Sequence, residues 1–130
     1  MPVGQFVFML HSHLPFYRKA GMWPFGEENL YECMAETYVP LLNAISELYD
    51  EGIQAKLTVG ITPILAEQLN DEHLQNGFLK YIDSRIASVA KDLDRYPDPK
   101  VAHSQHLKYL TRFFSYLFTK SSLNLFHKSK

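Results

Sequence analysis

Two short apolar runs separated by a long helical stretch constrain the fold of this chain more than any other feature. The first run covers residues 5–10 (Gln-Phe-Val-Phe-Met-Leu), and the second covers residues 55–61 (Ala-Lys-Leu-Thr-Val-Gly-Ile). Short, nearly continuous apolar runs suit strands that are covered on both faces, as in a parallel sheet. Between them, residues 30–48 carry Leu, Met and Ile at intervals of three and four, which predicts a helix. This order predicts a right-handed βαβ unit with parallel strands.

Proline, glycine and threonine mark the expected ends of these elements. Pro40 should kink the first helix or divide it in two, because proline lacks an N–H and crowds the preceding turn. Gly52 is well placed to end that helix. Thr62 and Pro63 form a suitable N-cap and first-turn pair for a short helix through Leu69.

The second half of the chain has purely helical patterning. From residue 71 one apolar stripe runs through the helix, interrupted only by Gly77, and Pro97-Asp98-Pro99 ends it. The stripe consists of Leu74, Phe78, Ile82, Ile86, Val89 and Leu93. A last amphipathic helix is expected over residues 101–127. Its inward-facing residues would be Leu107, Leu110, Phe114, Leu117 and Phe118.

Two strands with such apolar sequences do not make a complete sheet. Their outer backbone N–H and C=O groups need neighbouring strands, and the aromatic-rich helices need a surface to cover. The chain is therefore expected to be part of a larger α/β domain. The unpaired edges also lead us to expect self-association of the isolated chain.

Charge and cysteine content exclude several classes of function. The formal net charge is −1 and no basic block is present, so neither nucleic acid nor an anionic membrane is an expected partner. The N-terminus lacks the basic region of a signal peptide, and the run at residues 5–10 is far shorter than the roughly 20 apolar residues that span a bilayer. The single cysteine, Cys33, fits a reducing compartment. A soluble, cytoplasmic protein is expected.

His11-Ser12-His13, at the end of the first predicted strand, is the sharpest chemical feature. Residues two apart in a strand point to the same side, and ligands of parallel α/β folds bind at the carboxyl ends of strands. The pair suits hydrogen bonds to hydroxyls, proton transfer or metal binding, and the alternative is two hydrogen-bonded loop histidines. Trp23 should lie in a loop on the same side. Tryptophan there suits stacking on a sugar, although taken alone a packing role is the better interpretation.

The carboxylates are better explained as helix-surface residues than as an acid–base pair. Glu28, Glu32 and Glu36 lie four apart on one helix face, and acids near a helix start, Glu27 included, suit its dipole. Surface positions are also expected for Glu67, Gln68, His103 and His106. The sequence has no Gly-rich phosphate loop, no Cys-x-x-Cys pair and no Gly-x-Ser-x-Gly elbow.

Four segments resemble the start of glycoside hydrolase family 57, and its 1,4-α-glucan branching enzyme group in particular. They are residues 8–16 (Phe-Met-Leu-His-Ser-His-Leu-Pro-Phe), 23–28 (Trp-Pro-Phe-Gly-Glu-Glu), 36–42 (Glu-Thr-Tyr-Val-Pro-Leu-Leu) and 57–69 (Leu-Thr-Val-Gly-Ile-Thr-Pro-Ile-Leu-Ala-Glu-Gln-Leu). The resemblance covers about residues 4 to 115. Residues 1–130 would then be an N-terminal fragment of a distorted (β/α)7 barrel, with two parallel strands followed by long helices.

The resemblance implies a retaining mechanism on α-1,4-glucans such as glycogen and amylose, with no metal and no cofactor. It implies that His11 and His13 contact the sugar and that Trp23 lines the glucan groove. The family's glutamate nucleophile and aspartate acid/base lie on later strands, so no carboxylate here takes those roles. Since retaining hydrolysis needs both carboxylates, the chain alone is expected to be inactive.

Two other interpretations stay open at this stage. One is a barrel-type metal-dependent hydrolase in which His11 and His13 are ligands, although that class needs further ligands at later strand ends. The other is a small helical interaction module whose aromatic-rich final helix forms an oligomer interface.

Overall fold

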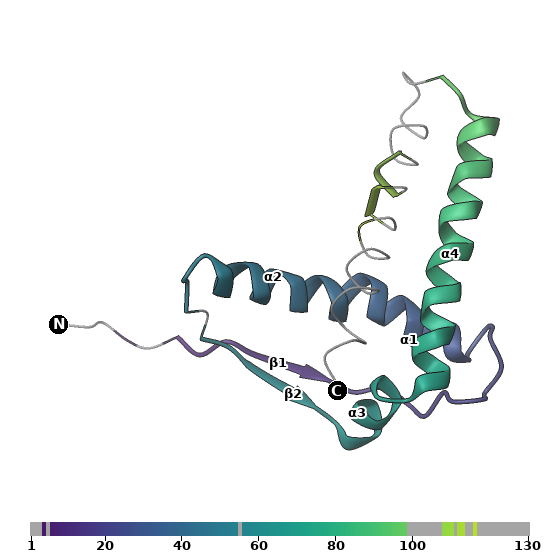
Figure 1. Ribbon diagram of the computed structural model, residues 1–130. Coiled ribbons are helices and arrows are strands. Elements are labelled where there is room, and N and C mark those ends of the chain that lie inside the picture. The colour runs from purple at the N-terminus through teal and green to yellow at the C-terminus, as the bar shows by residue number, and fades with distance from the viewer. Residues whose placement is uncertain are drawn as a thin grey trace.

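The computed structural model shows an α/β arrangement in which one long helical stretch connects two parallel strands (Figure 1). The structure describes residues 4, 6–54, 56–98, 108–110, 112–113 and 116. The expected final helix at residues 101–127 falls largely outside this part of the chain. The described portion contains no helix that is long and apolar enough to cross a membrane.

Strands β1 (Met9–Ser12) and β2 (Thr58–Ile61) pair in parallel, with His11 opposite Gly60. This confirms the predicted parallel pair, but both strands are shorter than expected, and β1 also begins and ends later than the apolar run. The reason is that pairing, not apolarity, sets the strand ends. The Thr58 N–H bonds the Phe8 carbonyl at 3.0 Å, and the Thr62 N–H bonds the Ser12 carbonyl at 3.2 Å. The ladder therefore extends through the polar residues His11 and Ser12.

The connection between the strands is divided as Pro40 predicts. Helix α1 (Glu27–Cys33) passes through a wider π turn, η1 (Met34–Tyr38), into helix α2 (Val39–Asp50). Pro40 is the second residue of α2, and the Val39 N–H before it bonds the Met34 carbonyl, five residues back, as in a π turn. The wider turn directly before it changes the register of the hydrogen bonds. Gly52, at φ 78°, follows the end of α2, as expected.

Helices α3 (Pro63–Leu69) and α4 (Glu72–Arg95) follow β2 and match the predicted ranges. Thr62 is the N-cap residue of α3, as predicted, but its side chain makes no capping hydrogen bond. Asp71 caps α4 by accepting a hydrogen bond from the Leu74 N–H at 3.1 Å. In Figure 1, α2 runs along the strands while α4 rises away from them.

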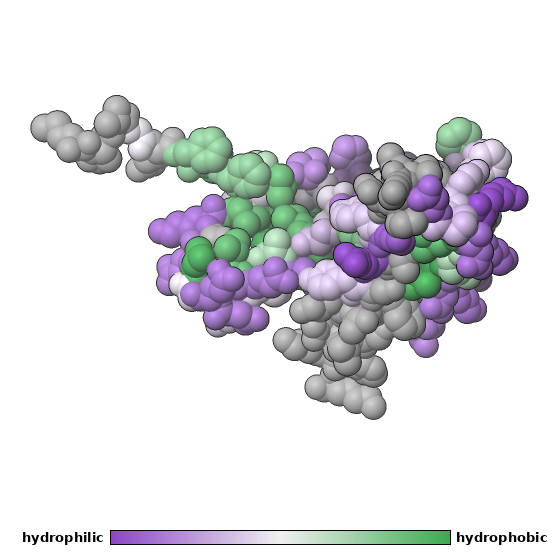
Figure 2. All heavy atoms as spheres, turned by 90° about the horizontal axis from the view of Figure 1, so that it is seen from above, coloured by the Kyte–Doolittle hydropathy of each residue, from purple (hydrophilic) through white to green (hydrophobic). Residues whose placement is uncertain are grey.

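The fully buried core lies among the helices and not on the sheet. It joins the apolar stripe of α4 to α1, η1 and α3, and its largest members are Tyr31, Phe78, Leu30, Leu65, Leu74 and Ile82. By contrast, Met9 of β1 is 67% exposed and Ile61 of β2 is 51% exposed. Figure 2 shows apolar atoms at the surface along the N-terminal stretch and over the part formed by α2 and the strands. The strands thus have the apolar residues of a covered sheet without that cover in the described part of the chain.

Candidate functional site

His11 and His13 lie side by side at the carboxyl end of β1. Their ring centroids are 5.5 Å apart and the rings are tilted by 33°. Both side chains are exposed. The prediction that the two histidines project together is therefore confirmed.

The two faces of β1 differ in what they contact. Ser12 points toward the helices, where its hydroxyl donates a 2.7 Å hydrogen bond to the Tyr38 hydroxyl oxygen. Side chains alternate along a strand, so the His11 side chain projects to the face opposite that of Ser12. His11 also borders one end of the cavity between α2 and the strands. A Cβ atom on its partner Gly60 would come within 3.1 Å of His11 Nδ1. Glycine at position 60 thus leaves room for the imidazole above β2.

Trp23 lies in the loop between β1 and α1 and is 79% exposed. A packing role, which the sequence alone favoured, is not what the structure shows. Among the described residues, the ring contact at this end of β1 joins His11 and His13, and Trp23 makes no ring contact with either of them. Gly26 closes the loop against its own backbone, because a Cβ there would lie 2.0 Å from the Gly21 carbonyl oxygen.

Gln68 holds the first part of this loop and corrects a prediction. It was expected at the helix surface but is only 1% exposed. Its amide oxygen accepts the Tyr17 N–H at 2.6 Å, and its amide nitrogen donates to the Pro15 carbonyl at 2.9 Å. The spacing contained the signal, since Gln68 lies three residues after Leu65 and therefore on the buried face of α3.

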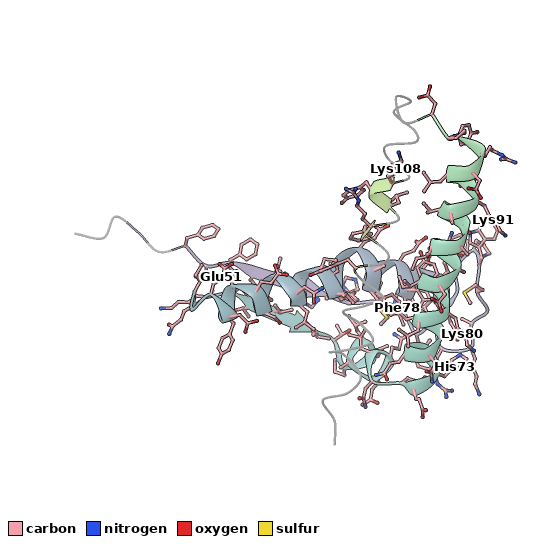
Figure 3. The ribbon with its side chains drawn as sticks, turned by 45° about the horizontal axis from the view of Figure 1, so that its top comes forward. Glu51, His73, Phe78, Lys80, Lys91 and Lys108 are labelled. Atoms are coloured by element: carbon pink, nitrogen blue, oxygen red, sulfur yellow. The ribbon has the colours of Figure 1, made fainter. Side chains whose placement is uncertain are left out.

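Glu27 holds the next part of the loop and was also expected at the surface, yet it is 7% exposed. Its Oε1 accepts the Lys19 N–H at 2.7 Å and lies 2.9 Å from His73 Nε2. Its Oε2 accepts the Tyr31 hydroxyl at 3.0 Å. Figure 3 shows His73 near the start of α4 and Phe78 further along the same helix. The missed signal is again spacing, because Glu27 lies four residues before Tyr31 on the buried face of α1.

Hydrogen bonding sets the charge state of this buried group. Burial alone would raise the pKa of Glu27, but hydrogen bonds from the Lys19 N–H, His73 and Tyr31 outweigh it and hold the pKa below its usual value. Burial, followed by the nearby Glu27 carboxylate, raises the pKa of the Tyr31 hydroxyl. Glu27 is therefore an ionised acceptor and Tyr31 a neutral donor at neutral pH.

The other predicted surface residues are largely where the sequence placed them. Glu32, Glu36 and Glu67 are exposed, while Glu28 is paired with Arg85 of α4. His103 and His106 lie outside the described residues. Within the described part of the chain, no three His, Cys, Asp or Glu side chains are grouped so that they could hold a metal ion.

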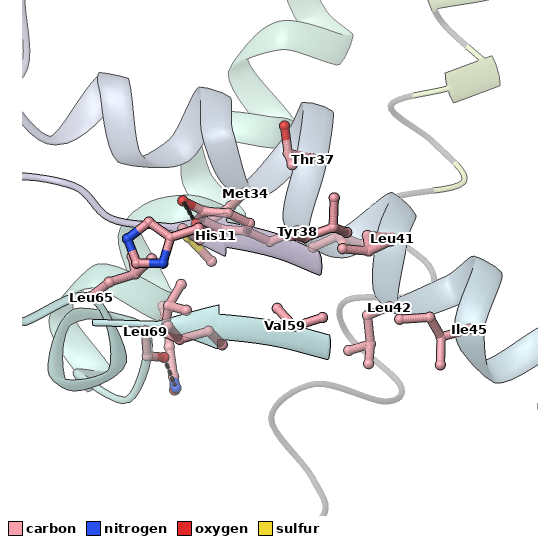
Figure 4. A pocket seen from close by; sticks show the side chains of 15 residues that line it. His11, Met34, Thr37, Tyr38, Leu41, Leu42, Ile45, Val59, Leu65 and Leu69 are labelled. Atoms are coloured by element: carbon pink, nitrogen blue, oxygen red, sulfur yellow. Dashed lines mark hydrogen bonds between the residues drawn. The ribbon is translucent and has the colours of Figure 1, made fainter. Parts of the chain in front are cut away.

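Two hollows flank the helices. One, of about 480 Å³, lies between α2 and the strands and is lined mainly by apolar side chains, among them Leu42, Ile45 and Val59 (Figure 4). The other, of about 600 Å³, lies between α1 and α4 and is lined by both polar and apolar side chains, with Glu27 and His73 in its wall. Glu27 and Glu28 both border this second hollow. Each is already engaged, Glu27 by the hydrogen bonds described above and Glu28 by Arg85, so neither is available as an acid or nucleophile for glycoside hydrolysis.

The chain is similar in sequence to two known proteins. The chain is 38% identical over 113 residues to a 1,4-alpha-glucan branching enzyme of Thermococcus kodakarensis, a match that covers 87% of this chain and 17% of that protein. It is 43% identical over 74 residues to a probable 1,4-alpha-glucan branching enzyme of Mycobacterium tuberculosis, covering 57% of this chain and 14% of that protein. The chain thus spans less than a fifth of the length of these relatives.

Solved structures give the same result. The family 57 branching enzyme of Pyrococcus horikoshii superposes with a TM-score of 0.84 at 38% identity, over 92% of this chain and 22% of that one. An alpha-amylase from Thermotoga maritima superposes with a TM-score of 0.75 at 26% identity, over 87% and 21%. The predicted α/β fold, a part of the family's (β/α)7 barrel with two parallel strands followed by helices, is confirmed. Residues 7–130 match the sequence profile of glycosyl hydrolase family 57, and the chain belongs to that family.

Proposed function

We propose that residues 1–130 form the N-terminal segment of the catalytic barrel of an α-glucan-processing enzyme of the branching type, and that His11, His13 and Trp23 contact the glucan. The observation that carries this proposal is the histidine pair on the exposed face at the carboxyl end of β1. In parallel α/β folds this end of the strands binds ligands. The relatives named as branching enzymes support the substrate class.

The chemistry of the three side chains fits a sugar. Each imidazole offers a ring nitrogen that donates or accepts a hydrogen bond with a glucose hydroxyl. Trp23 offers an exposed indole face on which the C–H face of a glucose unit can stack. These groups bind and orient a chain of glucose units, whereas bond cleavage needs two carboxylates that flank one glycosidic bond. We therefore assign substrate contact to this segment and place the nucleophile and the acid/base elsewhere in the enzyme.

Trp23 is the only tryptophan, so intrinsic fluorescence of the chain reports on this residue alone. Titration with maltoheptaose should shift and quench the emission, and cellohexaose, with its β-1,4 bonds, should not. His11→Ala combined with His13→Ala should weaken the response, while Tyr49→Ala, at an aromatic residue that is 81% exposed beyond the site, should leave it unchanged. A chain that responds equally to both sugars, or to neither, contradicts the proposed contacts.

Activity is tested in a chimera. The matching segment of the Thermococcus kodakarensis branching enzyme is replaced by that of this chain, to which it is 38% identical. We expect the chimera to branch amylose, and His11→Ala to lower kcat/KM by roughly tenfold or more, the value of about one lost hydrogen bond to substrate. Stoichiometric, tight zinc binding by the chain that is lost in the same variant would instead favour the metal-dependent hydrolase.

A further inference from the structure

The loop that carries Trp23 is held by two buried polar side chains from outside it. We propose that Gln68 and Glu27 are positioning residues that fix the backbone of residues 15–19 and thereby set where Trp23 meets the glucan. This inference rests on the proposed function, since it assigns a purpose to the loop's position. The first half of the inference, that these two side chains hold the loop, rests on the geometry alone.

Gln68 acts on the loop as the edge of a neighbouring strand would. Its carboxamide accepts the Tyr17 N–H and donates to the Pro15 carbonyl, at 2.6 and 2.9 Å. These are backbone groups two residues apart on one side of the chain, the pair that the N–H and C=O of a single residue on an adjacent parallel strand would bind. A carboxamide supplies both a donor and an acceptor, whereas a glutamate at position 68 has no donor for the Pro15 carbonyl.

Glu27 fixes the loop where its backbone is least favourable. Lys19 has φ 60°, in the left-handed region that residues other than glycine rarely adopt. The Lys19 N–H donates to Glu27 Oε1, and that carboxylate is in turn held by Tyr31 and His73. An ionised acceptor that is itself fixed from two sides makes a strong, directed hydrogen bond. The left-handed turn is therefore stabilised from α1.

Trp23 depends on these contacts because its own side chain is exposed. With 79% of its surface open to solvent, the indole gains little from packing, so its place follows from the backbone that leads to it. The end of the loop is also tied to α1, since the Glu27 N–H donates to the Gly21 carbonyl at 2.8 Å and the Glu28 N–H to the Met22 carbonyl at 3.2 Å. A pre-ordered loop lowers the entropic cost of binding a ligand.

The test uses the 130-residue chain with Gln68→Met, which keeps length and burial but removes both hydrogen bonds. Gln75→Met is the matched control, because Gln75 also donates to a backbone carbonyl, that of Leu69 at 2.9 Å, outside the loop. The readouts are the time-resolved fluorescence anisotropy of Trp23, its quenching by acrylamide, and the affinity for maltoheptaose. All are measured below the melting temperature of each variant.

We expect Gln68→Met alone to increase the fast motion of Trp23 and to weaken maltoheptaose binding roughly tenfold, because binding must then order a loop that the two hydrogen bonds no longer hold. Equal anisotropy in the two variants would overturn the holding role. A more mobile Trp23 with unchanged glucan affinity would overturn its link to binding. If Gln68→Met does not fold, Glu27→Met, which removes the acceptor of the Lys19 N–H, provides the same comparison. If the unmodified chain binds no glucan, the proposed function fails, while the anisotropy comparison still decides whether the loop is held.

Discussion

Gly77 interrupts the apolar stripe of α4, and replacing it with alanine should destabilise the protein. On an exposed helix surface, Gly→Ala stabilises by about 1 kcal/mol because alanine loses less backbone entropy. At position 77 a Cβ would lie 1.9 Å from the Tyr31 hydroxyl oxygen and 2.7 Å from the ring carbon that bears it. Tyr31 must therefore move by more than an ångström, or α4 must shift away from α1.

The surroundings of Tyr31 make that movement costly. Its side chain is fully buried and its ring contacts Phe78 and Tyr81, with centroids 6.4 and 5.8 Å away. Its hydroxyl donates to the ionised Glu27. Overpacking of this kind costs about 1–3 kcal/mol, and loss of a hydrogen bond to a charged group adds about 1.5–3 kcal/mol. After subtraction of the helix gain of about 1 kcal/mol, we expect Gly77→Ala to lower the free energy of unfolding by about 1.5–5 kcal/mol.

Urea denaturation followed by circular dichroism measures the effect. Ala90→Gly, at an exposed position of the same helix, calibrates the propensity scale and should cost about 1 kcal/mol. Tyr31→Phe removes the closest clashing atom, so the double variant with Gly77→Ala should be more stable than the sum of the two single changes by about 0.5 kcal/mol or more. A Gly77→Ala protein as stable as the original, or more so, would refute the close packing of α4 on Tyr31.

Three further predictions concern the site and the chain as a whole. Gly60→Ala brings a methyl group within 3.1 Å of His11 Nδ1, so we expect weaker maltoheptaose binding with little change in melting temperature, because the exposed imidazole can turn aside. The lowered pKa of Glu27 means that its stabilisation is complete above its usual value near 4.5 and is lost as the pH falls through the lower, folded value. Glu27→Gln should therefore flatten the fall in urea midpoint between about pH 6 and about pH 3, and an unchanged slope would assign the acid sensitivity elsewhere. In size-exclusion chromatography the isolated chain should elute as a self-associated species, given exposed apolar residues such as Phe8 beside the strand edges, and elution as a compact monomer would contradict this.

The helices were predictable from the sequence because their signals are local. The period of the apolar residues, the acidic cap at Asp71 and the breaks at Pro40 and Gly52 each act within a few residues of where they stand. Strand ends were not predictable in the same way. The ends of β1 depend on where β2 runs past it, which is decided by a partner about 49 positions away, as the pairing of Met9 with Thr58 shows.

The two loop-holding residues escaped prediction for a related reason. A polar side chain is expected at the surface unless something buried binds it. The partners of Gln68 are the backbone groups of Pro15 and Tyr17, more than 50 residues away in sequence. Since almost every residue carries the same backbone groups, the sequence does not indicate which of them a side chain binds. The one sequence signal that Gln68 is buried was its position on the same helix face as Leu65. His11 and His13, by contrast, were predictable as a pair because strand geometry alone places them together.

The arrangement of the core explains how a loop so exposed at its tip can still be placed. The buried residues of α1, η1, α3 and α4 form one cluster, against which Leu14 and Tyr17 of the loop also pack. The side chains that hold the loop by hydrogen bonds come from the same helices. Tyr31 connects the two, since it packs against Phe78 and donates to the same carboxylate that accepts the Lys19 N–H. Displacing Tyr31 with Gly77→Ala should therefore loosen Trp23 as well as lower stability. A destabilised variant whose Trp23 anisotropy is unchanged would show that the core and the glucan loop are not coupled through Glu27.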